Sequence, residues 1–273
     1  SHTGTFSVTG TNPITYSWKK DGKDWSGPNK PYASFKSIDG DDAGTYTLTV
    51  SNSYGSASGT FALSVIEKPR ITQHPSTVTT TEGKSLKLTA KVTGTERLSY
   101  QWLKDGQPYG KATKSPELTI SKPTITDTGD YSLQVTNTAG TATSDEAEVI
   151  IQYAPRIAEL PEELLVAAGG QHTFTAQATG LGSSGSNKHT YQWFKDGKKI
   201  NGATGYQLKL SKMDSSNSGD YYVEAKNSVG TTTSEIIEFQ VIDLPIITTQ
   251  PVALTLLEGA KANFNCVVAG ESM

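Results

Sequence analysis

Few residues of this chain have the types and spacing that catalysis or metal binding requires. The four histidines lie in separate segments and have no cysteine or carboxylate partners at metal-ligand spacing: His2, His74, His172 and His189. Cys266 is the only cysteine, and no catalytic partner for a thiolate accompanies it. No nucleophile elbow, phosphate-binding loop or dinucleotide-binding motif is present. We therefore predict that the chain is not an enzyme, that it has no catalytic, metal or cofactor site, and that its histidines are solvent-exposed.

The acidic residues 39–42, Asp-Gly-Asp-Asp, have the carboxylate oxygens that Ca²⁺ prefers. The corresponding residues in two later repeats of the same pattern are 124–127 and 214–217, and most of the carboxylates are lost there. A structural turn is therefore favoured over a calcium site.

Two aromatic residues outside the repeated pattern, Trp25 and Tyr54, are candidates for surface binding, because an exposed ring can stack on a sugar. Trp25 aligns with Tyr109 and Ile200, each seven residues after a tryptophan, and this shared apolar position favours packing on a sheet. Tyr54 lies at a predicted turn tip and is the second candidate.

One pattern occurs three times at a spacing of about 85–90 residues, which is the size of a small domain. It reads Trp-x-Lys-Asp-Gly, then Asp/Asn-x-Gly-x-Tyr, then Asn-x-x-Gly. The alternation and the Asp-Gly turns predict β-strands, and the tyrosine predicts a corner in which its hydroxyl bonds the backbone. The predicted core residues are Trp18, Trp102, Trp193, Tyr46, Tyr131, Tyr221, Leu48, Leu133 and Val223. The fold prediction is all-β, with tandem two-sheet sandwiches.

Each repeat resembles an immunoglobulin-like domain of the intermediate (I-set) type. Such domains usually join two strands by a disulfide packed on the tryptophan, but here one cysteine position holds Leu48, Leu133 or Val223, and the other holds Phe6, Ala90 or Ala176. Three domains without this bridge indicate folding in a reducing compartment. Cys266 aligns with the first-cysteine position of a fourth repeat, so we expect it to be a small buried apolar residue.

The repeats predict four segments: an immunoglobulin-like domain at 1–66 that lacks its first strand, complete domains at 67–152 and 153–242, and the start of a truncated fourth repeat at 243–273. In the first domain we expect strands at 6–10, 15–20, 33–38, 45–52 and 56–66. A Gly- and Ser-rich insertion at 181–187 is expected to be a tolerated loop, with a binding loop as the alternative. Linkers are nearly absent, which predicts an elongated rod of roughly 100 Å.

Composition excludes several classes of function. With a formal net charge of −3, the chain lacks the excess of basic residues that nucleic-acid binding requires. No apolar run approaches the roughly 20 residues of a membrane helix, so we expect no membrane insertion. No Asn-x-Ser/Thr site for glycosylation is present, which disfavours a eukaryotic surface receptor.

Residues 14–21 and the cysteine-free repeats resemble the highly immunogenic outer capsid (Hoc) proteins of T-even-type bacteriophages. The resemblance implies a capsid decoration protein that folds in the host cytoplasm and projects its immunoglobulin-like array from the virion. It also implies binding to the phage major capsid protein through a C-terminal region outside this chain, and weak attachment to bacterial surface glycans. The alternatives are a spacer in a giant cytosolic protein and an adhesion or accessory module of a bacterial surface protein.

Overall fold

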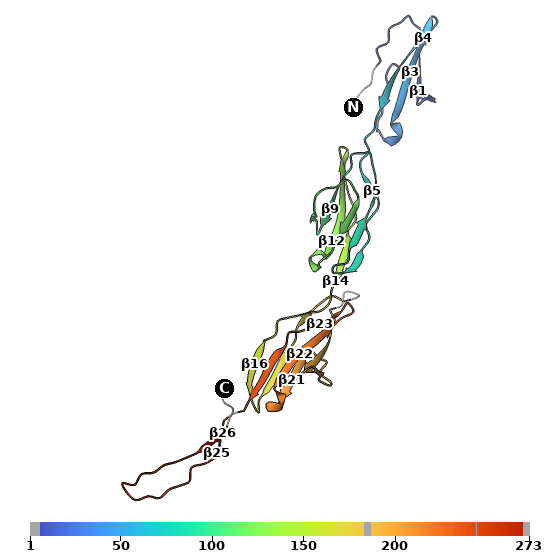
Figure 1. Cartoon of the computed structure of the whole chain (residues 1–273). Helices are drawn as coiled ribbons and strands as arrows, with labels where there is room; N and C mark the ends of the chain where they lie inside the picture. Colours follow the sequence, from blue (N-terminus) through green and yellow to red (C-terminus); the bar gives the residue numbers. More distant parts are fainter. Residues whose placement is uncertain (1–5, 183–186, 244, 270–273) are drawn as a thin grey trace. The chain divides into compact units, whose positions relative to one another are not determined.

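The structure is a computed structural model that describes residues 6–182, 187–243 and 245–269. These residues form β-strands, loops and short 3-10 turns (Figure 1). The single cysteine of the chain is a free thiol. The predicted all-β fold of tandem immunoglobulin-like sandwiches without disulfides is therefore confirmed.

The first sandwich contains one antiparallel sheet, with its strands in the order β2-β1-β3-β4. Its strands are β1 (Thr15–Lys20), β2 (Lys23–Trp25), β3 (Gly44–Asn52) and β4 (Gly55–Leu63). Residues 6–10 and 33–38 are not strands, which corrects two predictions. Residues 33–38 instead cover the sheet through side chains such as Phe35, which packs against the buried core of this sandwich.

The second sandwich has a large sheet in the order β10-β9-β12-β14-β6, with β13 paired to β12, and the smaller pairs β11-β7 and β5-β8. The strands are β5 (Arg70–Gln73), β6 (Val78–Thr81), β7 (Leu86–Thr89), β8 (Lys91–Thr93), β9 (Ser99–Lys104), β10 (Gln107–Pro108), β11 (Glu117–Ile120), β12 (Gly129–Asn137), β13 (Gly140–Thr143) and β14 (Ala147–Gln152). Pro75 lies between β5 and β6, where the chain changes sheet, as the sequence predicts.

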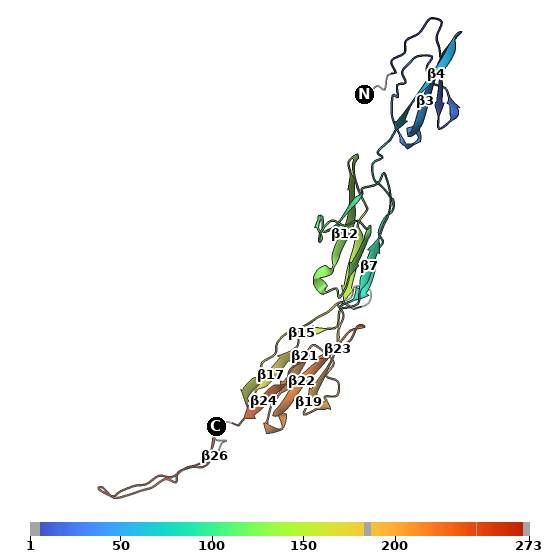
Figure 2. The ribbon, with the colours of Figure 1, turned by 45° about the horizontal axis from the view of Figure 1, so that its top comes forward.

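The third sandwich repeats this topology, with a sheet β16-β24-β22-β19-β20, β23 paired to β22, and the pairs β17-β21 and β15-β18 (Figure 2). Its strands are β15 (Arg156–Ile157), β16 (Glu163–Ala167), β17 (Gln171–Thr175), β18 (Ala178–Thr179), β19 (Thr190–Lys195), β20 (Lys198–Lys199), β21 (Gln207–Ser211), β22 (Gly219–Lys226), β23 (Thr231–Thr233) and β24 (Ile237–Ile242). Four residues of the predicted insertion, 183–186, lie outside the described residues.

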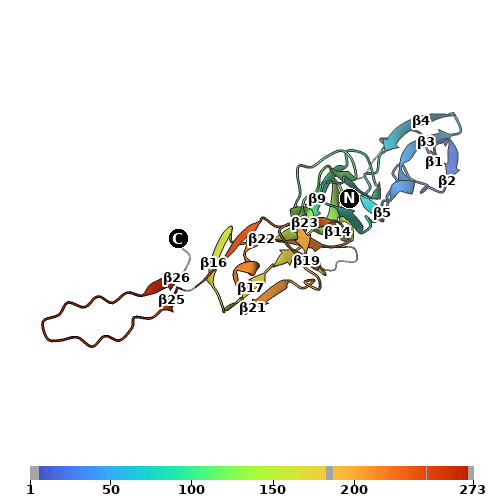
Figure 3. The ribbon, with the colours of Figure 1, turned by 60° about the horizontal axis from the view of Figure 1, so that its bottom comes forward.

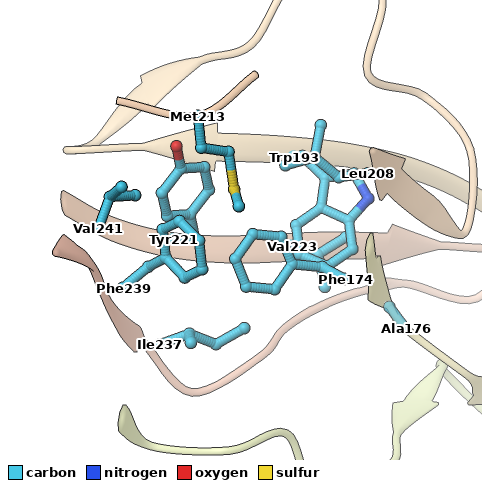
Figure 4. Close-up of a cluster of buried hydrophobic side chains, with 10 residues drawn as sticks. All are labelled: Phe174, Ala176, Trp193, Leu208, Met213, Tyr221, Val223, Ile237, Phe239 and Val241. Atoms are coloured by element: carbon cyan, nitrogen blue, oxygen red, sulfur yellow. The ribbon is translucent and has the colours of Figure 1, made fainter. Parts of the chain in front are cut away.

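The core of the third sandwich shows how the repeated pattern fills the space between two sheets (Figure 4). Trp193 and Tyr221 come from β19 and β22, and Phe174 lies between them on the opposite sheet, with ring centroids 5.7 and 5.1 Å away. Met213 fills the remaining gap beside the tyrosine ring (Figure 4). Ala176 and Val223, which occupy the two positions of the usual disulfide, belong to the same apolar cluster.

The last described segment contains β25 (Ile246–Thr249) and β26 (Val267–Ala269), which pair antiparallel. No second sheet covers this pair within the described part of the chain, as Figure 3 shows. Cys266 is therefore exposed, which corrects the prediction of a buried residue.

The predicted tyrosine corner is present in the first and third sandwiches. The Tyr46 hydroxyl donates to the Asp42 carbonyl at 2.8 Å, and the Tyr221 hydroxyl donates to the Asn217 carbonyl at the same distance. Burial, followed by the nearby charge of Asp196, raises the pKa of Tyr221 to about 12.

A second repeated brace joins the Asp-Gly turn to the start of the tyrosine strand. The carboxylates of Asp21, Asp105 and Asp196 accept backbone N–H groups of Thr45, Asp130 and Asp220 at 2.8, 2.9 and 2.9 Å. A Cβ at Gly44, Gly129 or Gly219 would lie 2.5–2.6 Å from these carboxylates, so the glycine of each Asp/Asn-x-Gly-x-Tyr motif makes room for the brace.

Candidate interaction surface at the tip of the first sandwich

The predicted core residues all lie inside the sandwiches and are structural. Exposed fractions are at most 3% for Trp18, Trp102, Trp193, Tyr46, Tyr131, Tyr221, Leu48, Leu133 and Val223. None of these side chains can therefore contact a partner without unfolding of its sandwich.

Trp25 belongs to the core of the first sandwich. Its ring lies 5.1 Å from Tyr46 and 6.1 Å from Trp18, edge-on in both cases, and stacks on Phe35 at 5.8 Å. These contacts hold the ring in the packing role that its alignment favours. The prediction of Trp25 as a surface-binding residue is therefore corrected.

Tyr54 has the opposite environment, because 87% of it is exposed. It lies in the turn between β3 and β4, and the Asn52 side chain fixes this turn by accepting the Tyr54 backbone N–H at 2.9 Å. The amide nitrogen of Asn52 donates to the Thr11 carbonyl at 3.1 Å, which ties the turn to the neighbouring loop. The sequence thus presents a rigidly held turn with a projecting aromatic ring.

A pocket of about 330 Å³ opens beside this turn. One wall is formed by Val8, Gly10 and Ile14, and the other wall is formed by Asn52 and Tyr54 with the start of β4. Apolar side chains, the hydroxyl residues Thr9, Ser51 and Ser56, and one side-chain amide line the pocket. Sequence reasoning identified Tyr54 but missed the pocket.

The other predicted sites have structural roles. Asp39 accepts the Asp41 backbone N–H at 3.0 Å and Asp42 accepts the Asp39 N–H at 3.2 Å, so the acidic stretch caps the turn η1 (Gly40–Asp42). Within 6–182, 187–243 and 245–269, no group of three or more His, Cys, Asp or Glu residues could hold a metal ion.

The histidines are not uniformly exposed, which corrects that prediction. His172 packs edge-on against Phe174 at 4.7 Å, and partial burial lowers its pKa. The Nε2 atom of His189 is buried. Both residues therefore contribute to packing in the third sandwich.

No helix among the described residues is long and apolar enough to cross a membrane.

Comparisons with known proteins agree with this fold. The Immunoglobulin I-set domain family matches residues 69–151 and 155–241. The chain is 26% identical over 282 residues to Neuroglian of Drosophila melanogaster, covering 96% of this chain and 21% of that protein. It is 30% identical over 247 residues to Hemicentin-2 of Mus musculus, covering 84% of this chain and 5% of that protein.

Among solved structures, an I-band fragment of titin superposes with a TM-score of 0.63 at 23% identity, covering 88% of this chain and 93% of the fragment. The chain spans only a small part of the curated relatives named above. Both relatives are animal proteins, and neither supports the predicted resemblance to the phage outer capsid proteins. The two matched regions make up more than half of the sequence, and the chain belongs to the immunoglobulin I-set domain family.

Proposed function

We propose that the chain is a non-enzymatic adhesion and spacer module, whose tandem sandwiches hold a partner-binding tip. The observation that carries the proposal is the ring of Tyr54, which is 87% exposed on a turn held by Asn52. Aromatic side chains on rigid supports are typical anchors of protein–protein contacts. The I-set relatives and the titin superposition support the use of the remaining sandwiches as spacers.

The adhesion function is tested with beads coated with the chain and applied to cells, against beads coated with a charge-matched protein. Tyr54→Ala should reduce retention of the beads. Tyr206→Ala is a matched control, because Tyr206 is 54% exposed, belongs to the third sandwich and does not line the pocket. Equal retention of both variants would show that the tip is not the contact surface.

The spacer function is tested by pulling the chain between its ends in a force microscope. The second and third sandwiches should unfold in separate events, each releasing about 30 nm of chain for about 85–90 residues. A single event for the whole chain would contradict the spacer function. Small-angle X-ray scattering tests the predicted rod of roughly 100 Å separately.

Capsid decoration is the second candidate, and the cysteine-free cores favour it. Apolar residues occupy both disulfide positions, Ala90 with Leu133 and Ala176 with Val223, as suits folding in a host cytoplasm. In this candidate a C-terminal region outside the chain binds the phage major capsid protein, and the array contacts bacterial surface glycans. The chain extended by that region should then bind capsids saturably, whereas the 273-residue chain should not.

A further inference from the structure

Strand β16 forms one edge of the larger sheet of the third sandwich (Figure 1). It pairs in parallel with β24 and, among the described residues, with no other strand. The Glu238 N–H donates to the Glu162 carbonyl at 2.8 Å, and the Ala168 N–H donates to the Ile242 carbonyl at 2.9 Å. Because the bonding residues of a parallel ladder alternate along a strand, residues 162, 164, 166 and 168 bond to β24.

The alternate residues of β16, Glu163, Leu165 and Ala167, therefore turn their N–H and C=O groups towards the free edge. Their side chains are exposed, with an exposed fraction of 47% for Leu165, whereas Leu164 and Val166 pack against the core. A strand edge with unpaired backbone groups is a template for another strand. β16 thus offers what strand addition needs, which is a row of free backbone groups with a row of side chains beside it.

Carboxylates continue from this edge across the face of the sheet that points away from the core. Glu163 pairs with Glu238 on β24, and Glu238 pairs with Asp220 on β22. A pocket of about 510 Å³ opens beside them, and it is lined by Glu162, Glu163, Asp220, Glu235, Ile236 and Glu238. The ion pairs found among the described residues use other carboxylates. Like charges at neighbouring positions of a sheet are destabilising, so this edge favours a cationic neighbour.

The second sandwich has the same edge with different side chains. Its strand β6 lies at the end of the sheet order, as β16 does in the third sandwich. Thr77 and Thr79 align with Glu163 and Leu165. Because the same topology forms with threonine at both positions, the fold requires neither the carboxylate nor the exposed leucine.

We propose that β16 binds an extended, basic segment of a partner protein as an added strand. The segment runs antiparallel, so that its backbone exchanges N–H and C=O hydrogen bonds with Glu163, Leu165 and Ala167. A lysine or arginine of the segment lies opposite Glu163, next to Glu238, and an apolar residue lies opposite Leu165. This surface belongs to a different sandwich from Tyr54, so the inference goes beyond the proposed function and does not depend on it.

Charge decides between a basic partner and a second copy of the chain. If two β16 strands paired antiparallel about Leu165, Glu162 and Glu163 of both copies would border the same short ladder. A basic segment instead brings a cation beside Glu163 and Glu238, which have no ion pair among the described residues. The same carboxylates thus disfavour self-pairing and favour a basic strand.

Fluorescence anisotropy of a labelled peptide of alternating lysine and valine, titrated with the full 273-residue chain, tests the proposal. Saturable binding is expected with a Kd on the order of 0.1–1 mM, because one added strand buries less than the roughly 1,200 Å² of a stable interface. A peptide of alternating glutamate and valine should not bind. The lysine–valine peptide methylated at each backbone nitrogen keeps its charge but has no N–H donors, so it should not bind either.

Hydrogen exchange locates the contact. The amides of Glu163, Leu165 and Ala167 have no backbone acceptor among the described residues, so they should exchange quickly in the free chain. The lysine–valine peptide should slow their exchange. Thr77 and Thr79 of the second sandwich are the internal reference, and their exchange should not change.

Leu165→Pro separates recognition from folding. Proline is tolerated where the N–H of an edge strand faces away from the sheet, so the ladder to β24 and the melting temperature of the third sandwich should be retained. Peptide binding should be lost, because the N–H at the centre of the free edge is removed. Glu163→Gln should weaken binding about two- to fivefold through the loss of an exposed ion pair. Glu146→Gln removes the same charge from an exposed position of the second sandwich, and this control should bind normally.

The proposal is overturned by absence of saturable binding at millimolar chain, by binding that survives Leu165→Pro, or by binding of the methylated peptide. Slowed exchange at Thr77 and Thr79 instead of at β16 would also overturn it. If Leu165→Pro lowers the melting temperature, the methylated peptide decides alone. Self-association in sedimentation velocity that Glu163→Gln strengthens, without peptide binding, would identify a second copy as the occupant and refute the basic partner.

Discussion

Replacing Trp102 with phenylalanine should cost much less stability than the same change at Trp193. The indole N–H of Trp193 donates to the Gly205 carbonyl at 3.0 Å, and that of Trp18 donates to the carbonyls of Pro28 and Lys30 at 3.1 and 3.2 Å. The indole nitrogen of Trp102 is buried and has no hydrogen-bond partner among the described residues. Three equivalent tryptophans thus differ in one polar contact.

The magnitude follows from the cost of an unpaired polar group. All three changes remove the same atoms from a core, so the apolar transfer and cavity contributions cancel to first order. Trp193→Phe loses a hydrogen bond to the exposed Gly205, whose net value is about 0.5–1.5 kcal/mol, whereas Trp102→Phe removes a buried unpaired donor that itself costs about 1–3 kcal/mol. Trp193→Phe should therefore be more destabilising than Trp102→Phe by at least about 1.5 kcal/mol.

Native-state hydrogen exchange on the full chain measures the two effects separately, because peptides from β12 and β22 report the opening free energies of the second and third sandwiches. Trp18→Phe, read from β3, is the internal control and should behave like Trp193→Phe. The reasoning is refuted if Trp102→Phe destabilises its sandwich as much as Trp193→Phe does.

Three further outcomes are expected. Gly129→Ala should destabilise the second sandwich by about 2 kcal/mol or more in denaturant unfolding, because φ is +152° and the new Cβ would lie 2.6 Å from the Asp105 carboxylate. Gly110→Ala is the control. Its φ is +68° and no atom lies near the new Cβ, so it should lower the free energy of unfolding by only about 1 kcal/mol. Hydrogen bonds from the Lys104 side chain and then from the Asp130 backbone N–H lower the pKa of Asp105. The stability that the Asp105 carboxylate contributes is therefore lost as the pH falls below about 4. In Asp105→Asn, the free energy of unfolding should depend less on pH in that range. The pKa of Tyr221 is raised to about 12, so the stability that the protonated hydroxyl contributes is lost as the pH rises from about 10 towards 12. Tyr221→Phe should remove this loss of stability at alkaline pH, as measured by unfolding followed with circular dichroism.

The sequence predicts the central strands well because each carries a strong local pattern. The Trp-x-Lys-Asp-Gly motif places β1, β9 and β19, and the tyrosine motif places β3, β12 and β22. Both motifs combine side-chain alternation with a turn of defined chemistry, which is local information. The carboxylate brace to the tyrosine strand was missed, because it joins residues 24 apart and only the structure shows that Gly44 makes room for Asp21.

The weaker strands show where local patterns fail. Residues 33–38 have apolar alternation, yet the segment pairs with no neighbouring strand in the described chain, and Phe35 packs on Trp25 instead. Cys266 aligns with buried Ala90 and Ala176, but burial depends on a second sheet that does not cover it in the described chain. Burial is a property of the surrounding structure, so alignment to a core position does not determine it.

The candidate site was predictable in part. Tyr54 follows Asn52 in a turn motif, so its exposure could be inferred from the sequence. The pocket could not, because its walls come from residues about 40 positions apart.

The three cores compensate for the absent disulfide in different ways. At the position paired with the corner tyrosine, the first sandwich has Phe61 and the third has Ile237, whereas the second has Ala147. The first sandwich adds Phe6 against Trp18, at the position where the others have alanine. Because packing is close to crystalline density, a large residue accepted in one core would overpack another. The repeats therefore share a pattern of backbone turns and braces, while each hydrophobic core is fitted to its own set of side chains.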